Sequence, residues 1–221
     1  MKAMVLAAGR GSRLAPLTDH TPKPLLPVAG KPLILQTVER LKAAGISQIV
    51  INTHHLGGQI EAALGNGAEM GVSIQYSQEP ELLETGGGIK KALPILKDEI
   101  FVLCNGDIYS DFDLQTLPTS LTAGDLAHLV LVPKPPSREH GDFVCREGRV
   151  VGRGSDYVYA GVAMIHADLF QFAPAGAFSL RDLLFDAVAK QRVGAQIHSG
   201  QWIDIGTPED YRRANASITT D

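Results

Sequence analysis

The sequence predicts an α/β protein built on a doubly wound β-sheet that is mixed but mainly parallel. Short apolar runs alternate with amphipathic runs of helical spacing through the first half of the chain. The order strand, helix, strand, helix is typical of parallel strands joined by crossover helices. With 221 residues, 44% of them hydrophobic and 20% charged, the chain is long enough to bury a core without disulfides or metals.

The first half supplies the regular alternation. Residues 2–7 form an apolar strand, and a loop rich in glycine and proline follows as far as residue 32. Ile34, Val38 and Leu41 then recur at helical spacing. The patterns that follow predict strands over 48–53, 72–78 and 100–104 and helices over 56–64 and 87–96, the second helix being interrupted at Pro94.

The second half alternates less regularly. A helix is predicted after Ser179, a favourable N-cap, and another begins at Thr207-Pro208 with acidic residues in its first turn. The strands predicted here cover 126–132, 157–165 and 201–205, with a hairpin over 143–151 that turns at Glu147-Gly148. Because no linker divides the chain, we expect residues 1–221 to form a single domain.

Composition excludes several classes of protein. Lys and Arg total 20 against 24 Asp and Glu, a net charge of −4, and no basic run suggests a nucleic-acid partner. No apolar run approaches the length of a membrane span. The apolar run at the start of the sequence is too short for the hydrophobic region of a signal peptide. Cys104 lies in an apolar run and is expected to be a buried thiol. We expect a cytoplasmic protein without membrane partners, as a monomer or weak homodimer.

A glycine-rich loop follows the first strand directly, in the sequence Leu6-Ala7-Ala8-Gly9-Arg10-Gly11-Ser12-Arg13-Leu14. Glycines let the backbone approach a ligand and turn its N–H groups toward an anion. The loop departs from the dinucleotide fingerprint, because Leu14 stands where the third glycine would be, and it contains no Walker A sequence. By itself it fits a phosphate cradle or an ordinary glycine-rich turn about equally well.

A second motif, Pro22-Lys23-Pro24-Leu25-Leu26-Pro27, presents a lysine on a stiff loop. Together the two motifs resemble the signature of the sugar-1-phosphate nucleotidyltransferases. The resemblance continues at Cys104-Asn105-Gly106-Asp107 and at 202–211, and it covers nearly the whole chain. It implies a Rossmann-like nucleotide-diphospho-sugar transferase fold. The implied reaction transfers a nucleoside monophosphate from an NTP to a sugar 1-phosphate and releases pyrophosphate.

The resemblance also implies roles for individual residues. Arg13 binds the leaving phosphates, and Lys23 binds the α-phosphate and the sugar phosphate. Asp107 and Asp204 hold Mg²⁺, whose preferred ligands are hard oxygens. Because the acceptor is already an anion, the task is to gather phosphates and stabilise charge, and Arg13, Lys23 and Asp107 are the implied catalytic residues. The implied nucleotide-binding residues are the two cations with Ala8, Gly9, Gly11, Ser12 and Gly86.

Two further stretches bear on the base and the sugar. Relatives carry a pattern similar to L-G-T-A where this chain has Leu83-Glu84-Thr85-Gly86, and Gly86 still allows close approach of a pyrimidine. The segment 84–94 and the short chain resemble compact uridylyltransferases that act on N-acetylmuramate α-1-phosphate in cell-wall sugar recycling. UTP and that sugar phosphate are the implied substrates. The implied sugar-binding residues are Asn105, Gly141 and Gly154.

Two alternatives stay open on the sequence. Guanylyl- or cytidylyltransferases acting on mannose 1-phosphate, heptose 1-phosphate or another phosphate acceptor share the opening motifs. A non-catalytic nucleotide-sugar sensor could use the same fold. A sensor, however, needs no paired metal carboxylates, so the presence of Asp107 and Asp204 beside Arg13 and Lys23 favours an enzyme.

Overall fold

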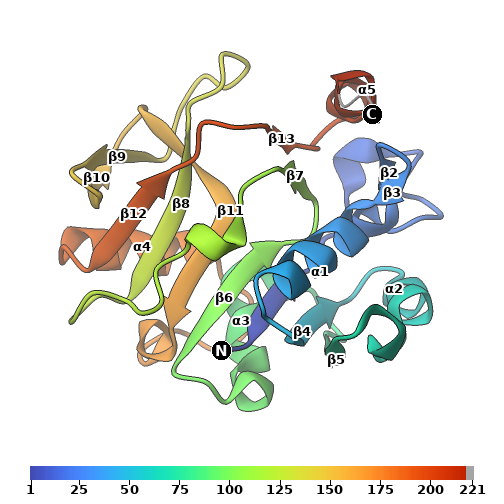
Figure 1. The fold of residues 1–221 in the computed structure, drawn as a ribbon, viewed down its shortest axis with the longest axis horizontal. Coiled ribbons are helices and arrows are strands. Elements are labelled where there is room, and N and C mark those ends of the chain that lie inside the picture. Colours follow the sequence, from blue (N-terminus) through green and yellow to red (C-terminus); the bar gives the residue numbers. More distant parts are fainter. Residues whose placement is uncertain (218–221) are drawn as a thin grey trace.

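Strands from both halves of the chain join one nine-stranded sheet in the computed structural model, which describes residues 1–217 (Figure 1). In chain order its strands are β1 Ala3–Leu6, β4 Gln48–Thr53, β5 Ser73–Gln78, β6 Ile100–Asn105, β8 Ala127–Pro133, β9 Phe143–Arg146, β10 Arg149–Arg153, β11 Tyr157–His166 and β12 Val193–Ile197. They lie in the order β5-β4-β1-β6-β11-β8-β12-β10-β9. β10 and β11 run antiparallel to the other strands, so the predicted mixed, mainly parallel sheet is confirmed.

Helices cover both faces of the sheet, namely α1 Leu33–Ala43, α2 Gly57–Leu64, α3 Glu84–Leu96 and α4 Leu180–Ala189. α1 and α2 pack on one face, where Val38 and Ile60 share a buried cluster with Val102 of β6. α3 and α4 pack on the other face, where Ile89 and Leu184 share a cluster with Leu103. Successive strand residues point to opposite faces, so the two clusters form two separate apolar layers.

The strand order places the carboxyl ends of β1 and β6 at a topological switch point. The chain passes from β1 through α1 to β4 on one face, and from β5 through α3 to β6 on the other. β1 and β6 are parallel neighbours, with Leu6 opposite Asn105. Loops that leave two such strands diverge and open a crevice, which is where open α/β sheets bind ligands. The glycine-rich loop and the turn after Asn105 therefore begin at this crevice.

Smaller elements are assembled beside this edge. They are the 3₁₀ helices η1 Ser12–Leu14 and η2 Lys23–Leu25, the paired strands β2 Pro27–Val28 and β3 Lys31–Pro32, the paired strands β7 Ile108–Ser110 and β13 Trp202–Asp204, and α5 Pro208–Ser217. Leu14 and Val28 are buried with Ile205 in one small cluster. The hydroxyl of Tyr211 donates to the carbonyl of Pro27 at 2.8 Å. The segment that carries β13 and α5 is thus held against the opening loop.

Most predicted elements are present, and the differences have physical causes. α3 begins at Glu84 and runs through Pro94 to Leu96, so the predicted interruption is wrong. Pro94 lies in the last turn, where its ring removes one backbone hydrogen bond and the earlier turns remain intact. β7 and β12 were not predicted because both are short, and β12 is held by pairing with β8 rather than by its own pattern. The remaining 3₁₀ helices are η3 Ala68–Met70, η4 Leu114–Thr116 and η5 Ala167–Phe170.

A search of residues 1–217 for a helix with the length and apolar character of a membrane span finds none.

Candidate active site

The glycine-rich loop turns at Gly11, whose backbone is left-handed with a φ of 65°. A Cβ at this position would lie 3.0 Å from Thr18 Cγ2 and 3.1 Å from Lys23 Cβ, so a side chain would be crowded as well as strained. The hydroxyl of Thr18 donates to the Gly11 carbonyl at 2.9 Å and secures the turn. Gly9, by contrast, borders open space. The loop is therefore fixed at its bend and open where a ligand would approach.

The lysine of the proline-rich motif reaches the end of β6. Lys23 opens η2 between two prolines, and its side chain is only 9% exposed. Its Nζ donates to Asp107 Oδ2 at 2.6 Å, across 84 positions of sequence. The structure thus brings the proline-rich motif next to Asp107, as the sequence led us to expect.

Asp204 reaches the same region through the small β7–β13 ladder. In its register Asp204 is directly opposite Ile108, the residue that follows Asp107. Asp204 Oδ2 accepts from Arg138 Nη2 at 2.6 Å, and the Arg138 guanidinium also lies over the Trp202 ring at 5.7 Å. Each of the two predicted metal carboxylates is therefore neutralised by a basic side chain.

Three adjoining hollows share residues at the carboxyl edge of β1 and β6. The first, of about 390 Å³, is lined by the glycine-rich loop with Lys23, Asp107 and Gly206. The second, of about 340 Å³, contains both Asp107 and Asp204 and extends to the start of α4. The third, of about 350 Å³, lies between Ala8 and the start of α3. Leu6 and Asp107 border all three, and the volumes suit small ligands.

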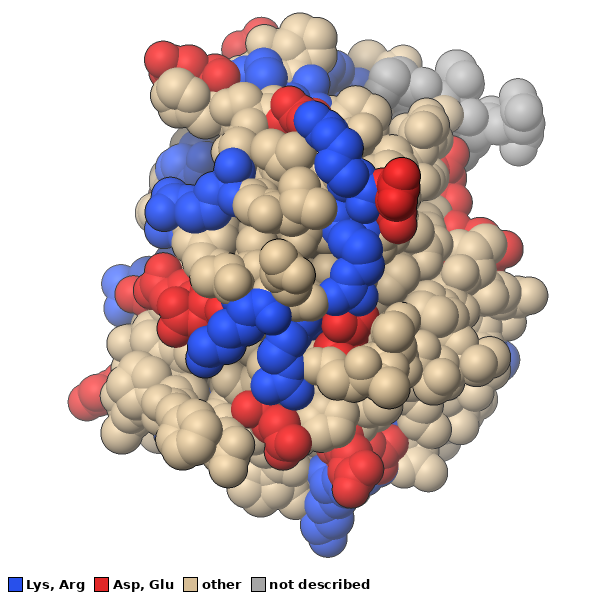
Figure 2. All heavy atoms as spheres, turned by 90° about the vertical axis from the view of Figure 1, so that its left-hand side faces the viewer, with Lys and Arg blue, Asp and Glu red and all other residues tan. Residues whose placement is uncertain are grey.

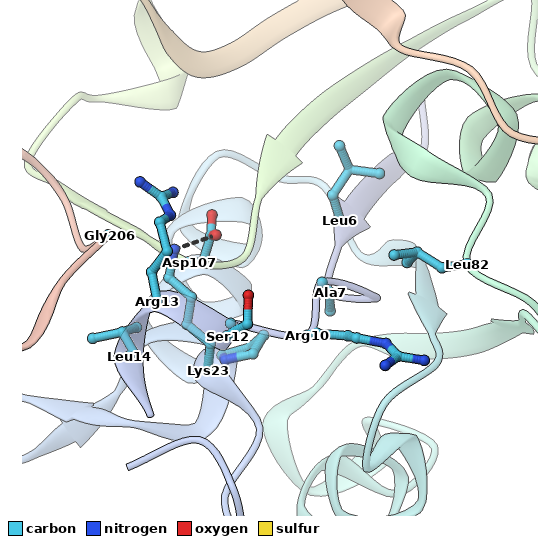
Figure 3. A pocket seen from close by; sticks show the side chains of 13 residues that line it. Leu6, Ala7, Arg10, Ser12, Arg13, Leu14, Lys23, Leu82, Asp107 and Gly206 are labelled. Atoms are coloured by element: carbon cyan, nitrogen blue, oxygen red, sulfur yellow. Dashed lines mark hydrogen bonds and ion pairs between the residues drawn. The ribbon is translucent and has the colours of Figure 1, made fainter. Parts of the chain in front are cut away.

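The basic side chains that line the first hollow point in different directions. Figure 3 shows Arg13 extending alongside the Lys23–Asp107 pair, whereas the Arg10 guanidinium points away from it. Arg13 lines the first two hollows, and its guanidinium lies close to Gly206 at the start of α5. Arg13 is exposed and makes no hydrogen bond or ion pair within residues 1–217. Its charge is free to meet a phosphate group.

A buried network that the sequence did not reveal joins the glycine-rich loop to α3. Asn52 Oδ1 accepts from the N–H of Ala7 at 2.8 Å, and Asn52 Nδ2 donates to Glu79 Oε1 at 2.7 Å. The other oxygen of Glu79 accepts from the N–H of Leu83 at 3.0 Å, just before α3. Asn52 and Glu79 are almost fully buried. Asn52 and Glu79, which belong to no sequence motif, thereby link the glycine-rich loop to the start of α3, the two walls of the third hollow.

The remaining predicted binding residues fall into two groups. Asn105 lines the second and third hollows, and Ser12 lines the first. The other group consists of three glycines that the structure does not place on any of the three hollows, Gly86, Gly141 and Gly154.

Tight packing explains why these three positions are glycine. A Cβ on Gly86 would lie 2.3 Å from the Phe178 ring, and the Gly86 N–H donates to the Phe178 carbonyl at 2.9 Å. A Cβ on Gly141 would meet backbone atoms of Ser155 at 2.8 Å, and one on Gly154 would meet a Val144 methyl at 2.3 Å. The structure therefore gives these glycines a packing role and leaves their predicted ligand contacts as proposals.

Several lining residues were not predicted. Thr85 and Glu84 stand at the start of α3, and Glu84 adopts a left-handed φ of 58°. Tyr159 lines the second hollow, and its hydroxyl is buried without a partner within residues 1–217. Burial raises the pKa of Tyr159, so the phenol stays protonated. Arg138 and Arg181 also line the second hollow, and no sequence motif marks them.

The donor set of the second hollow fits a divalent cation shared by Asp107 and Asp204. No third His, Cys, Asp or Glu within residues 1–217 completes a metal-binding cluster with them. Mg²⁺ keeps several waters and is commonly held by one or two carboxylates plus substrate phosphates. Two carboxylates beside Arg13 and Lys23 match that pattern, and phosphate oxygens and waters would be the other ligands.

A glycine-rich phosphate loop and paired aspartates at the switch point of an α/β sheet define a protein that binds phosphorylated nucleotides. Comparison with known proteins gives the family. The model of the nucleotidyl transferase family matches residues 2–221, and this chain belongs to that family. The enzyme class and the fold that the sequence predicted are confirmed.

Individual relatives cover nearly the whole chain. The chain is 45% identical to the N-acetylmuramate α-1-phosphate uridylyltransferase of Neisseria meningitidis, over 98% of its own length and 97% of that protein. It is 31% identical to the D-glycero-α-D-manno-heptose 1-phosphate guanylyltransferase of Aneurinibacillus thermoaerophilus, covering 99% and 98% of the two chains. A Bacillus anthracis crystal structure described as a glucose-1-phosphate thymidylyltransferase superimposes with a TM-score of 0.87 at 25% identity, covering 100% and 97%.

Proposed function

We propose that the protein transfers UMP from UTP to N-acetylmuramate α-1-phosphate, giving UDP-N-acetylmuramate and pyrophosphate, in cell-wall sugar recycling. The observation that carries the proposal is the 45% identity, over almost the full length of both chains, to an enzyme with that name. The guanylyltransferase relative stands well below it at 31%. The arrangement of Arg13, Lys23, Asp107 and Asp204 supplies the chemistry that such a transfer requires.

The reaction needs two polyanions to be held in line. A phosphate oxygen of the acceptor forms a bond to the α-phosphorus, and the bond from that phosphorus to the bridging oxygen breaks, so pyrophosphate leaves with the electron pair. The acceptor oxygen is already ionised, and a strong general base is unnecessary. The rate enhancement comes from positioning and from charge stabilisation at the α-phosphate and the leaving group.

The chain's own residues divide this work. The backbone around Gly9 and Gly11 receives the triphosphate, and Arg13, free of protein partners within residues 1–217, binds the leaving phosphates. Lys23 Nζ lies beside Asp107 and binds the α-phosphate and the sugar phosphate. Asp107 and Asp204 would hold Mg²⁺, which when bound neutralises phosphate charge and holds the groups in register.

A nucleotide and acceptor panel tests the proposal. Pyrophosphate release with Mg²⁺ is measured for UTP, CTP and GTP against N-acetylmuramate, mannose, heptose and glucose 1-phosphates. We expect UTP with N-acetylmuramate α-1-phosphate to give the highest kcat/KM, by at least tenfold. A preference for GTP with mannose or heptose 1-phosphate would support the guanylyltransferase alternative, and no release with any pair would support a sensor.

We also propose that the chain acts as one domain, in the cytoplasm, as a monomer or weak homodimer. Nine strands between Ala3 and Ile197 share one sheet, and cluster contacts tie the segment up to Ala214 to the opening loop, which supports a single folding unit. Light scattering across a hundredfold range of concentration tests the oligomeric state. A concentration-independent tetramer would contradict it.

A further inference from the structure

The second hollow carries more positive charge than the transfer reaction uses. Lys23 pairs with Asp107, and Arg138 pairs with Asp204. The third acid of this hollow, Asp142, is engaged by the backbone, since its Oδ2 accepts from the Tyr159 N–H at 3.0 Å. Of the arginines that line this hollow, Arg13 and Arg181 have no carboxylate partner among the described residues.

Arg181 is distinct from the triphosphate-binding cations. Arg13 lines both the first hollow, beside the glycine-rich loop, and the second hollow, whereas Arg181 lines only the second. Leu180 and Leu184 of α4 and Phe143 of β9 border this hollow with it, giving an apolar wall on which a sugar ring can lie. Its charge therefore lies beside the apolar wall of the second hollow and apart from the glycine-rich loop.

The position of Arg181 on α4 is electrostatically unfavourable in the protein alone. It is the second residue of the helix, and the partial positive charge at a helix N-terminus disfavours a cation there. The side of the molecule that carries β9, β10 and α4 in Figure 1 shows a band of Lys and Arg side chains in Figure 2. Two arginines of β9 and β10 have partners. Arg146 pairs with Asp156, and Arg153 lies 4.2 Å from the Phe185 ring centroid. A charge that breaks a local rule without a compensating contact is expected at functional sites.

We propose that Arg181, together with Arg138, binds a carboxylate carried on the ring of the acceptor sugar. The inference rests on the proposed function, because N-acetylmuramate differs from N-acetylglucosamine by a lactyl ether that ends in a carboxylate. A planar guanidinium matches a carboxylate with two parallel hydrogen bonds, which gives orientation as well as attraction. Arg138 lies in the loop between β8 and β9, and its Nη2 already donates to the carboxylate of Asp204. Its remaining N–H groups donate to the carboxylate of the acceptor.

The test compares two acceptors that differ in that group. The kcat/KM values for N-acetylmuramate and N-acetylglucosamine α-1-phosphates, with UTP and Mg²⁺, are measured for the wild type, Arg181→Gln and Arg181→Lys. We expect Arg181→Gln to lower the value for N-acetylmuramate α-1-phosphate at least tenfold and to leave the other within twofold. Arg181→Lys is expected to keep part of the wild-type kcat/KM for N-acetylmuramate α-1-phosphate, because lysine retains the positive charge but lacks the two parallel N–H donors of a guanidinium. Arg153→Gln is the matched control and changes neither value, because Arg153 packs on Phe185 of α4 outside the three hollows.

Calorimetry of UDP-N-acetylmuramate binding without metal gives a readout independent of turnover. Arg181→Gln is expected to weaken this binding at least tenfold and to leave the binding of UDP-N-acetylglucosamine unchanged. Equal losses with both sugars, or no loss with either, would overturn the inference while the proposed function stands. If the wild type transfers UMP to neither acceptor, the proposed function and this inference both fail.

Discussion

At the scale of single residues, Glu84 holds a backbone conformation that is more typical of glycine. Its φ of 58° is the left-handed conformation that favours glycine, and it precedes the closely packed Gly86. A glutamate at this position therefore affects the backbone conformation first. Glu84 lines the third hollow with an exposed side chain, so the substitution also leaves a carboxylate at its rim.

The free energy of unfolding of Glu84 variants should depend on how readily the new residue adopts the left-handed backbone conformation, rather than on its charge. Glu84→Gly relieves about 1 kcal/mol of left-handed strain and loses a similar amount through the greater freedom of the unfolded chain. We expect its free energy of unfolding to stay within about 1 kcal/mol of the wild type. Glu84→Val, whose β-branched side chain resists this conformation, should be destabilised by roughly 1–2 kcal/mol. Urea unfolding distinguishes these, and a valine variant as stable as the glycine variant would contradict the assignment.

Cys104 confirms a residue-scale prediction from the sequence. The thiol lies at 2% exposure in β6, as its apolar neighbours predicted, and burial raises its pKa to about 11. Because the folded protein binds this proton more tightly than the unfolded chain does, the thiol stabilises the fold below pH 9 and that stability is lost as pH rises toward 11. No reaction step depends on it.

The pH dependence of unfolding isolates this effect. The difference in unfolding free energy between wild type and Cys104→Ala, measured in urea at pH 8 and pH 10, should move by about 1 kcal/mol in favour of the variant. Other groups that titrate in this range contribute equally to both proteins and cancel. A difference that does not change with pH would contradict the burial argument.

At the scale of elements, the Asn52–Glu79 network joins the end of β1 and the strands β4 and β5 to the start of α3. The Asn52 amide donates to the Glu79 carboxylate, and the two side chains accept hydrogen bonds from the backbone N–H groups of Ala7 and Leu83. Hydrophobic periodicity cannot reveal such a link, because it depends on which strands become neighbours. The network therefore positions the glycine-rich loop through contacts that lie outside both sequence motifs.

Removing Asn52 should damage stability and nucleotide binding together. Asn52→Ala leaves the Ala7 N–H and one oxygen of Glu79 buried without partners, which costs roughly 2–4 kcal/mol. We expect a higher KM for UTP as the loop loses its anchor. Asn66→Ala is the control, since Asn66 is exposed and caps only a local turn. A variant at Asn52 that unfolds at the same urea concentration as the wild type would refute the structural role.

Local patterns predicted the elements that carry their own signals. The strand before the glycine-rich loop, the helix through Val38 and the helix capped by Ser179 all form near the predicted positions. Capping at Thr207 is also observed, since its hydroxyl accepts from the N–H of Asp210 at 3.2 Å. β7 and β12 carried no such signal, because three- and five-residue strands are decided by the partners that the fold provides.

At the scale of the whole molecule, the site is the product of chain topology. Arg13, Lys23, Asp107 and Asp204 come from segments far apart in sequence, and the switch point between β1 and β6 brings them to adjoining hollows. Family resemblance indicated these four side chains in advance. The resemblance did not extend to Arg138 and Arg181, which stand in stretches without a motif and join the site only through the folding of β9, β13 and α4.

The central claim is that Asp107 and Asp204 share one divalent cation with the triphosphate. The most direct measurement is the Mg²⁺ concentration that gives half-maximal pyrophosphate release, determined for Asp204→Asn with wild type and Asp156→Asn as references. Asp156 pairs with Arg146 outside the three hollows, so its variant should match the wild type. We predict that Asp204→Asn raises the required Mg²⁺ at least tenfold and that Asp107→Asn lowers kcat at least a hundredfold. Unchanged Mg²⁺ dependence in Asp204→Asn, with the protein folded, would contradict the shared-cation site.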